Sequence, residues 1–185
     1  MEKIKVKKNK FAEILAEFTE NMCRESQYRS IVQPEQSGLN NSKKIEFEIL
    51  ILNMFIIVWL CQIKKFPKDL LDFYTINMYE KILPLIPEEI KIGLSKFGNA
   101  SVTLPQETLL AAFEQEWLNE RFTTYYKAMK NLDTESGVWE IGKIIVRNLG
   151  GDVSRPVSIM KAMTSFFLSL KHIGNYLDNF EIEQS

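Results

Sequence analysis

Histidine occurs only once in this 185-residue sequence, as His172, and cysteine occurs only twice. A catalytic zinc site usually needs two or three imidazoles, and a di-iron helical bundle needs two Glu-x-x-His motifs, so one histidine excludes both classes of site. The glycine motifs of dinucleotide-binding folds, P-loop proteins and serine hydrolases are missing as well. We therefore expect no metal and no cofactor, and a protein that is not an enzyme.

The two cysteines, Cys23 and Cys61, lie far apart and have no CxxC spacing. Cys61 falls inside a strongly apolar run, so we expect two buried thiols in a reducing compartment instead of a disulfide. The N-terminal lysines are followed by FAEILAEF, in which two glutamates interrupt the apolar residues, and this is not a secretory signal. A cytoplasmic location is the expectation.

Charge of one sign is not in excess, because 23 basic residues face 24 acidic ones and the net charge is −1. No overall field therefore directs the molecule towards nucleic acid or acidic lipid. The charges are uneven locally, since residues 1–10 carry five lysines and DNFEIEQS at the other end carries three acids. We expect a solvated basic arm over 1–10, a single helical domain over 11–180 and a short acidic tail over 181–185. The alternative for the arm is contact with a polyanion.

Glycine and proline are also few, at eight and six residues, and they fall between apolar segments. No proline lies well inside a proposed helix, so the pattern predicts an all-α, single-domain bundle of six or seven helices. The expected helices cover residues 11–31, about 44–64, 68–83, 87–97, 105–132, 138–149 and 154–180.

The most apolar stretch runs from Ile49 to Cys61 and contains one polar side chain, Asn53. Its thirteen residues make about 20 Å of helix, whereas the hydrocarbon core of a bilayer is about 30 Å thick. A longer helix would bring the charges of Glu48 or Lys64 into the hydrocarbon, which is costly. We therefore expect no membrane span, and a buried central helix over about 44–64.

Seven apolar residues in the last helix alternate at spacings of four and three, which is a heptad pattern. They form a seam made of Ile159, Met163, Phe166, Leu170, Ile173, Leu177 and Phe180. Such a seam is either internal packing or a contact surface, and the sequence leaves both open. Because no catalytic group is evident, the favoured function is contact with a protein partner, or self-association along residues 159–180.

Residues 141–165 offer a different function, because a short helix, a glycine turn and a second helix have the layout of a helix-turn-helix. LGGDVSRPVSIMKAM resembles the recognition-helix region of bacterial winged-helix repressors. The resemblance implies a DNA-binding regulator in which Arg155, Ser158, Lys161 and Ser165 face the groove. With Arg147 nearby, the start of the second helix is alternatively an anion site. Helix capping by Gly150 and Ser154 explains the same residues without a ligand.

A small-ligand site is the third alternative, in which Trp59, Trp117 or His172 lines a pocket at the centre of the bundle. Glu116 and Glu120 lie one helical turn apart and can bind a cation. Arg121 beside them favours a solvated, charged helix face instead.

Overall fold

The computed structural model describes residues 3–24, 27–31, 39–86, 111 and 113–183. Within them are six α-helices, and the all-α class is confirmed. The expected helix at 87–97 and the start of the one at 105–132 lie outside the described residues. The α-helices are α1 (Lys8–Arg24), α2 (Leu39–Ile63), α3 (Lys68–Ile82), α6 (Asn119–Met129), α7 (Glu135–Asn148) and α8 (Pro156–Asp178). The shorter elements are the 3-10 helices η1 (Gln27–Ile31) and η3 (Leu83–Leu85), the π-helical η4 (Glu114–Leu118), and the strands β1 (Ile4–Val6) and β2 (Phe180–Ile182).

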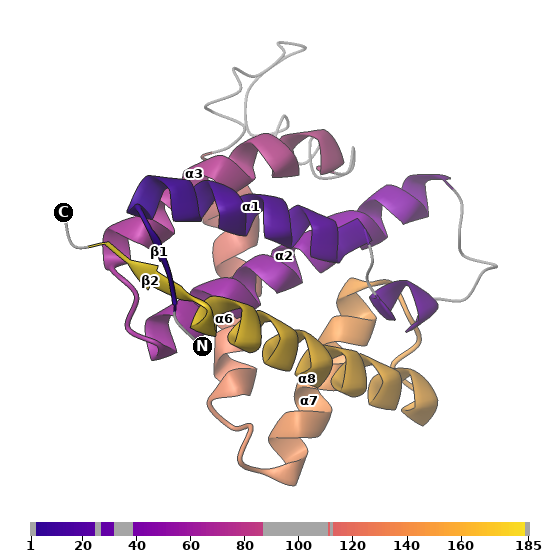
Figure 1. Ribbon diagram of the computed structural model, residues 1–185. Helices are drawn as coiled ribbons and strands as arrows, with labels where there is room; N and C mark the ends of the chain where they lie inside the picture. The colour runs from indigo at the N-terminus through magenta and orange to yellow at the C-terminus, as the bar shows by residue number, and fades with distance from the viewer. Residues whose placement is uncertain (1–2, 25–26, 32–38, 87–110, 112, 184–185) are drawn as a thin grey trace, which may run out of the picture.

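Helix α2 is the centre of the fold, as expected, and it packs against α1, α3, α6 and α8 (Figure 1). Every side chain from Phe47 to Ile57 is at most 3% exposed, so this part of the helix is enclosed on all sides. Each buried leucine, isoleucine or phenylalanine contributes about 1.5–3 kcal/mol to stability. The apolar run therefore supplies much of the energy that holds the other helices in place.

By length and composition, α2 also meets the requirement for a membrane span over Ser42–Ile63, and it alone does so among the described helices. Within its most apolar window, however, 72% of the residues are buried inside the protein. A core helix passes the same test of composition, so the helix by itself does not place the chain in a bilayer.

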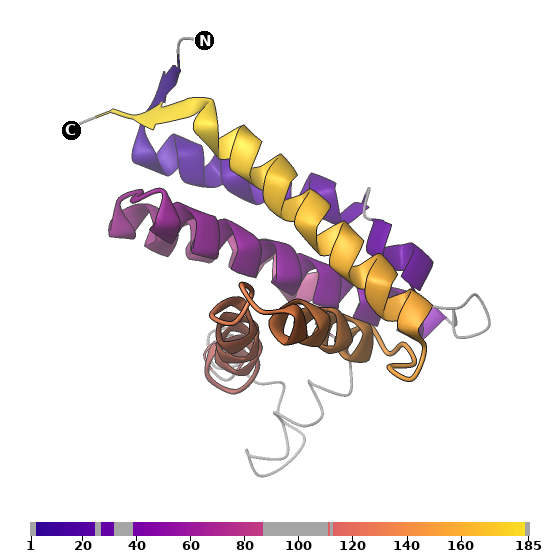
Figure 2. The ribbon, with the colours of Figure 1, turned by 90° about the horizontal axis from the view of Figure 1, so that it is seen from below.

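Four of the remaining helices form two groups around α2, and α3 packs against α1 and α2. In Figure 2, α1 and α8 lie on one side of it and the α6–α7 pair lies on the other. Phe18 of α1 stacks on Tyr176 of α8 with a centroid separation of 3.9 Å, which joins the first group. Helices α7 and α8 approach closely at Gly142, where an added Cβ would lie 2.7 Å from side-chain carbons of Ile159 and Met163.

The two strands pair in parallel, with Ile4 opposite Phe180 and Val6 opposite Ile182. They lie where the sequence predicts a solvated basic arm and an acidic tail, so the charges at the two ends face each other. Lys5 and Glu181 are opposite in the register, an arrangement that stabilises cross-strand pairs. The strands were not predicted, because three residues are too few to show an alternating pattern.

Candidate functional site

The predicted heptad seam of α8 faces the interior. Ile159, Phe166, Ile173, Leu177 and Phe180 are 0–9% exposed, and Met163 and Leu170 pack partly buried against the core. Of the two alternatives left open for the seam over 159–180, this burial supports internal packing and leaves the seam no free surface for self-association. The seam is instead occupied by the contacts of α8 with α7 and α2.

The opposite face of α8 carries a second apolar stripe that the sequence analysis missed. Four large side chains there are 42–65% exposed, which is unusual for a continuous row on a helix. They are Val157, Met160, Phe167 and Leu168, with Val153 just before the helix at 38%. We call these five residues the outer stripe. Thr164, also exposed, completes the spacing of three and four residues between Met160 and Leu168.

The predicted DNA- or anion-binding residues are only partly accessible. Arg147, Arg155 and Lys161 are exposed, whereas Ser158 is half-buried and Ser165 is 7% exposed in the core face of α8. A side chain as buried as Ser165 does not reach a DNA groove from this conformation. The three exposed residues supply basic charge at the start of α8, and the DNA-binding function stays a prediction.

The turn before α8 is explained largely by capping. Gly150 has φ +78°, and the amides of Gly150 and Gly151 donate to the carbonyls of Arg147 and Val146, which is the predicted glycine C-cap. The predicted N-cap at Ser154 is wrong, since Arg155 occupies that position and Pro156 begins the helix. Ser154 instead donates its amide and hydroxyl hydrogens to the Asp152 carboxylate, at 2.8 and 2.7 Å.

That carboxylate also bears on the predicted anion site. Asp152 lies 3.7 Å from the Arg155 guanidinium, and the hydrogen bonds from Ser154 lower the pKa of Asp152. A negative charge of the chain itself therefore already lies at the place where an external anion was expected.

The residues of the predicted central pocket contact different helices. Trp59 of α2 is half-buried and packs edge-on against Tyr126 of α6 at 5.2 Å. His172 is exposed and stacks on Phe18 of α1 at 5.8 Å. The side chain of Trp117 lies outside the described part of the structure. No contact joins Trp59 to His172 among the described residues, and neither lines the pocket at the end of α2.

Arg121, expected on a solvated face, instead reaches Glu48, which is 1% exposed in the middle of the core. Its Nη2 and Nε donate to Oε1 and Oε2 of Glu48 at 2.9 and 3.2 Å. Burial raises the pKa of the Glu48 carboxyl, although the hydrogen bonds from Arg121 act in the opposite direction. A contact between residues so far apart in sequence leaves no local signal in the pattern of either helix.

The cysteines and acids of the described residues form no cluster that could hold a metal ion. Cys23 and Cys61 are free and buried as predicted, and burial raises the pKa of each thiol to about 12. Neither is a ready thiolate at neutral pH. Within the described residues there is no group of three or more His, Cys, Asp or Glu side chains arranged to hold a metal ion.

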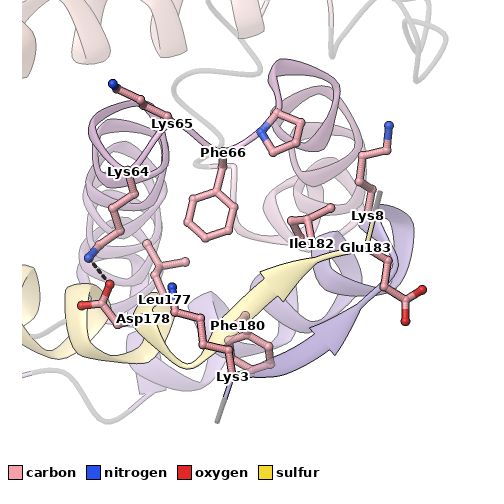
Figure 3. Close-up of a pocket in the computed structure, with 11 residues that line it drawn as sticks. Lys3, Lys8, Lys64, Lys65, Phe66, Leu177, Asp178, Phe180, Ile182 and Glu183 are labelled. Atoms are coloured by element: carbon pink, nitrogen blue, oxygen red, sulfur yellow. Dashed lines mark hydrogen bonds and ion pairs between the residues drawn. The ribbon is translucent and has the colours of Figure 1, made fainter. Parts of the chain in front are cut away.

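A pocket of about 660 Å³ lies where the ends of α2 and α8 meet the two strands (Figure 3). Apolar side chains form its floor: Phe66, Pro67, Leu177, Phe180 and Ile182. Charged side chains stand around it: Lys3, Lys8, Lys64, Lys65, Asp178 and Glu183. We call this the lysine-rimmed pocket. The sequence analysis did not predict this pocket, because its residues come from four separate segments; Lys3 and Lys8 belong to the basic arm, and Leu177 and Phe180 to the α8 seam.

One rim residue, Lys65, has a left-handed backbone with φ +59°. It occupies the C-cap of α2, where its amide donates to the Gln62 carbonyl and the amide of Phe66 donates to the Cys61 carbonyl. Glycine is the usual residue in this conformation, because a side chain adds about 1–2 kcal/mol of strain there.

Lys65→Gly is therefore expected to raise the free energy of unfolding by about 0.5–1 kcal/mol, since the relief of strain exceeds the entropy that glycine adds to the unfolded chain. Urea unfolding followed by circular dichroism measures the change. Gln62→Gly, in the helical part of the same turn, is the matched control and should lose about 1 kcal/mol. A loss of stability in both variants would contradict the role of strain at Lys65.

No protein-family model, no curated protein and no solved structure matches the chain.

Proposed function

We propose that this protein acts through protein–protein contact, and that the outer stripe of α8 is the contact surface. The observation that supports this is the exposure of Val157 at 65%, Met160 at 58% and Leu168 at 48% on one side of a helix whose other side is core. Single apolar residues on a surface are ordinary, whereas a row at helical spacing is typical of a surface that a partner covers.

The partner that fits best is a second copy of the chain, with the two α8 helices antiparallel about a twofold axis. Centred between residues 162 and 163, this arrangement sets Val157 of each copy against Phe167 and Leu168 of the other. It also places Lys171 of each copy opposite residue 154 of the other, beside the ion pair of Asp152 and Arg155.

The contact is small, and the dimer is expected to be weak. The helical part of the stripe, from Val157 to Leu168, extends over about three turns, or roughly 17 Å. Contacts of this size lie at the low end of specific interfaces. We therefore expect dissociation in the micromolar range and an equilibrium that responds to concentration.

Sedimentation velocity from about 1 to 500 µM tests the proposal, because mass action makes a weak dimer visible across such a range. Met160→Glu and Leu168→Glu should each leave a monomer at every concentration, because a carboxylate is then buried without a partner. Ile76→Glu is the matched control: Ile76 is 61% exposed on α3, away from the stripe, and its replacement should leave the dimer intact. A wild-type protein that stays monomeric, or a dimer that survives both stripe variants, would overturn the proposal.

A further inference from the structure

The lysine-rimmed pocket carries an excess of positive charge. Four lysines and two acids line it, and Asp69 pairs with Lys8 from outside the lining, so that the balance is one positive charge: Lys3 and Lys65 against Glu183. Lys8 pairs with Asp69, and Lys64 pairs with Asp178 at 2.6 Å. Lys3 and Lys65 have no ion-pair or hydrogen-bond partner among the described residues, so two ammonium groups at the rim remain available to an anion.

The floor below these charges is apolar and well supported. Leu177 and Phe180 are 1% and 9% exposed, and Phe66 is half-buried. The ring of Phe11, which is fully buried, lies 5.7 Å from that of Phe66 and 4.7 Å from that of Phe180. Figure 3 shows the Phe66 ring in the middle of the pocket, facing Leu177 and Phe180. A floor of this kind suits the carbon skeleton of a ligand better than a bare inorganic ion.

The backbone conformation of Lys65 is a second observation, separate from the charge of the pocket, that supports a role of this residue in binding. The cap of α2 needs only a left-handed residue, which glycine supplies without strain, yet the chain carries a lysine there. Strained backbone of this kind is commonly kept where the side chain is used. In Figure 3 the Lys65 side chain extends from the rim into solvent, and its flexible stem can turn over the mouth of the pocket.

We propose that the lysine-rimmed pocket binds a small amphiphilic organic anion. Its carboxylate or phosphate head is held by Lys3 and Lys65, and its adjoining alkyl or aryl body lies on Phe66, Leu177 and Phe180. The pocket volume of about 660 Å³ lies within the usual range for small-molecule sites.

Titration calorimetry with decanoate and with decyl phosphate tests this, and decanol is the uncharged control. Both anions are expected to bind, and decanol is expected to bind at least about fivefold more weakly, because it offers no charge to the lysines. Between the two anions, the tighter one identifies the head group. Amide chemical shifts should change at residues 64–67 and 180–183.

Substitutions separate binding from folding. Lys3→Gln with Lys65→Gln is expected to weaken decanoate binding about three- to tenfold. Lys65→Gly should bind more weakly than the wild type although the protein becomes more stable, which a purely structural role of Lys65 does not produce. Lys68→Gln removes the same charge from an exposed residue outside the pocket, and it should bind as the wild type does.

Three results would overturn the proposal. The first is binding of decanol as tight as that of decanoate, and the second is an equal effect of Lys68→Gln and of the double variant. The third is failure to bind either free anion, whether or not the protein associates with vesicles of anionic phosphatidylglycerol. Vesicle binding in that case would identify the basic rim as a membrane-docking surface instead of a ligand site.

Discussion

Replacing Arg121 with methionine is expected to lower the free energy of unfolding by about 3–5 kcal/mol at neutral pH. Glu48 is 1% exposed, and among the described residues Arg121 is the group that hydrogen-bonds both of its carboxylate oxygens. Methionine fills a similar volume but leaves the carboxylate buried without a partner. Urea unfolding at pH 7 measures the loss.

The loss should shrink as the pH falls. Burial raises the pKa of Glu48 in the folded protein above its ordinary value near 4.5, and without Arg121 the pKa rises further. The folded state then holds a proton where the unfolded state does not, so stability falls as the pH rises above the unfolded pKa. At pH 5 the variant should therefore lie closer to the wild type than at pH 7.

The matched control removes both charges. Glu48→Gln combined with Arg121→Met should recover most of the loss, because no unpaired charge remains in the core. A single variant within about 1 kcal/mol of the wild type at pH 7 would show that water or another group solvates Glu48. A deficit that stays the same from pH 7 to pH 5 would also contradict the assignment.

Asn53→Leu is expected to raise the free energy of unfolding by about 1–3 kcal/mol. Asn53 is 1% exposed at the middle of α2, and among the described residues neither its side-chain oxygen nor its nitrogen has a hydrogen-bond partner. Leucine has nearly the same shape, so the exchange removes two unsatisfied polar atoms without a large change in packing. The midpoint of urea unfolding should move to higher denaturant at an unchanged slope.

Asn148→Leu is the control for Asn53. Asn148 is 9% exposed, and its side-chain nitrogen donates to the Tyr125 hydroxyl at 2.9 Å. The same exchange there removes a hydrogen bond and leaves the buried hydroxyl unpaired, so it should destabilise the protein. If Asn53→Leu were destabilising too, the Asn53 amide would be bound to a buried water or packed more tightly than leucine allows.

Features that depend on neighbouring residues were predictable from the sequence. The apolar run around Asn53 is long and uninterrupted, and it forms the buried central helix. The spacing of the α8 seam predicted one face of that helix, and Gly150 predicted the left-handed C-cap. In each case the signal lies within one helix or at one residue, so no distant segment is needed to recognise it.

Features that depend on distant segments were not predictable. Glu48 and Arg121 are polar residues on two helices, and either alone is typical of an exposed position. The lysine-rimmed pocket likewise joins residues near 3, 65 and 180 that no periodicity relates. The outer stripe of α8 was visible in the sequence, but the seam on the same helix has the stronger spacing. When a helix has two apolar faces, its sequence does not indicate which face packs against the core; the folded structure does.

The pairing of β1 with β2 affects how the protein is made. A ribosome synthesises Ile4 long before its partner Phe180, and almost the whole described chain lies between them. Contacts of such long range form late and slow down folding. Phe11 of α1 also packs against Phe180, with ring centroids 4.7 Å apart, so this contact cannot form before Phe180 has been synthesised. A nascent chain that lacks residues 177–182 therefore lacks the sheet and also Leu177, Phe180 and Ile182 of the pocket floor, so the pocket forms only after this segment has been synthesised.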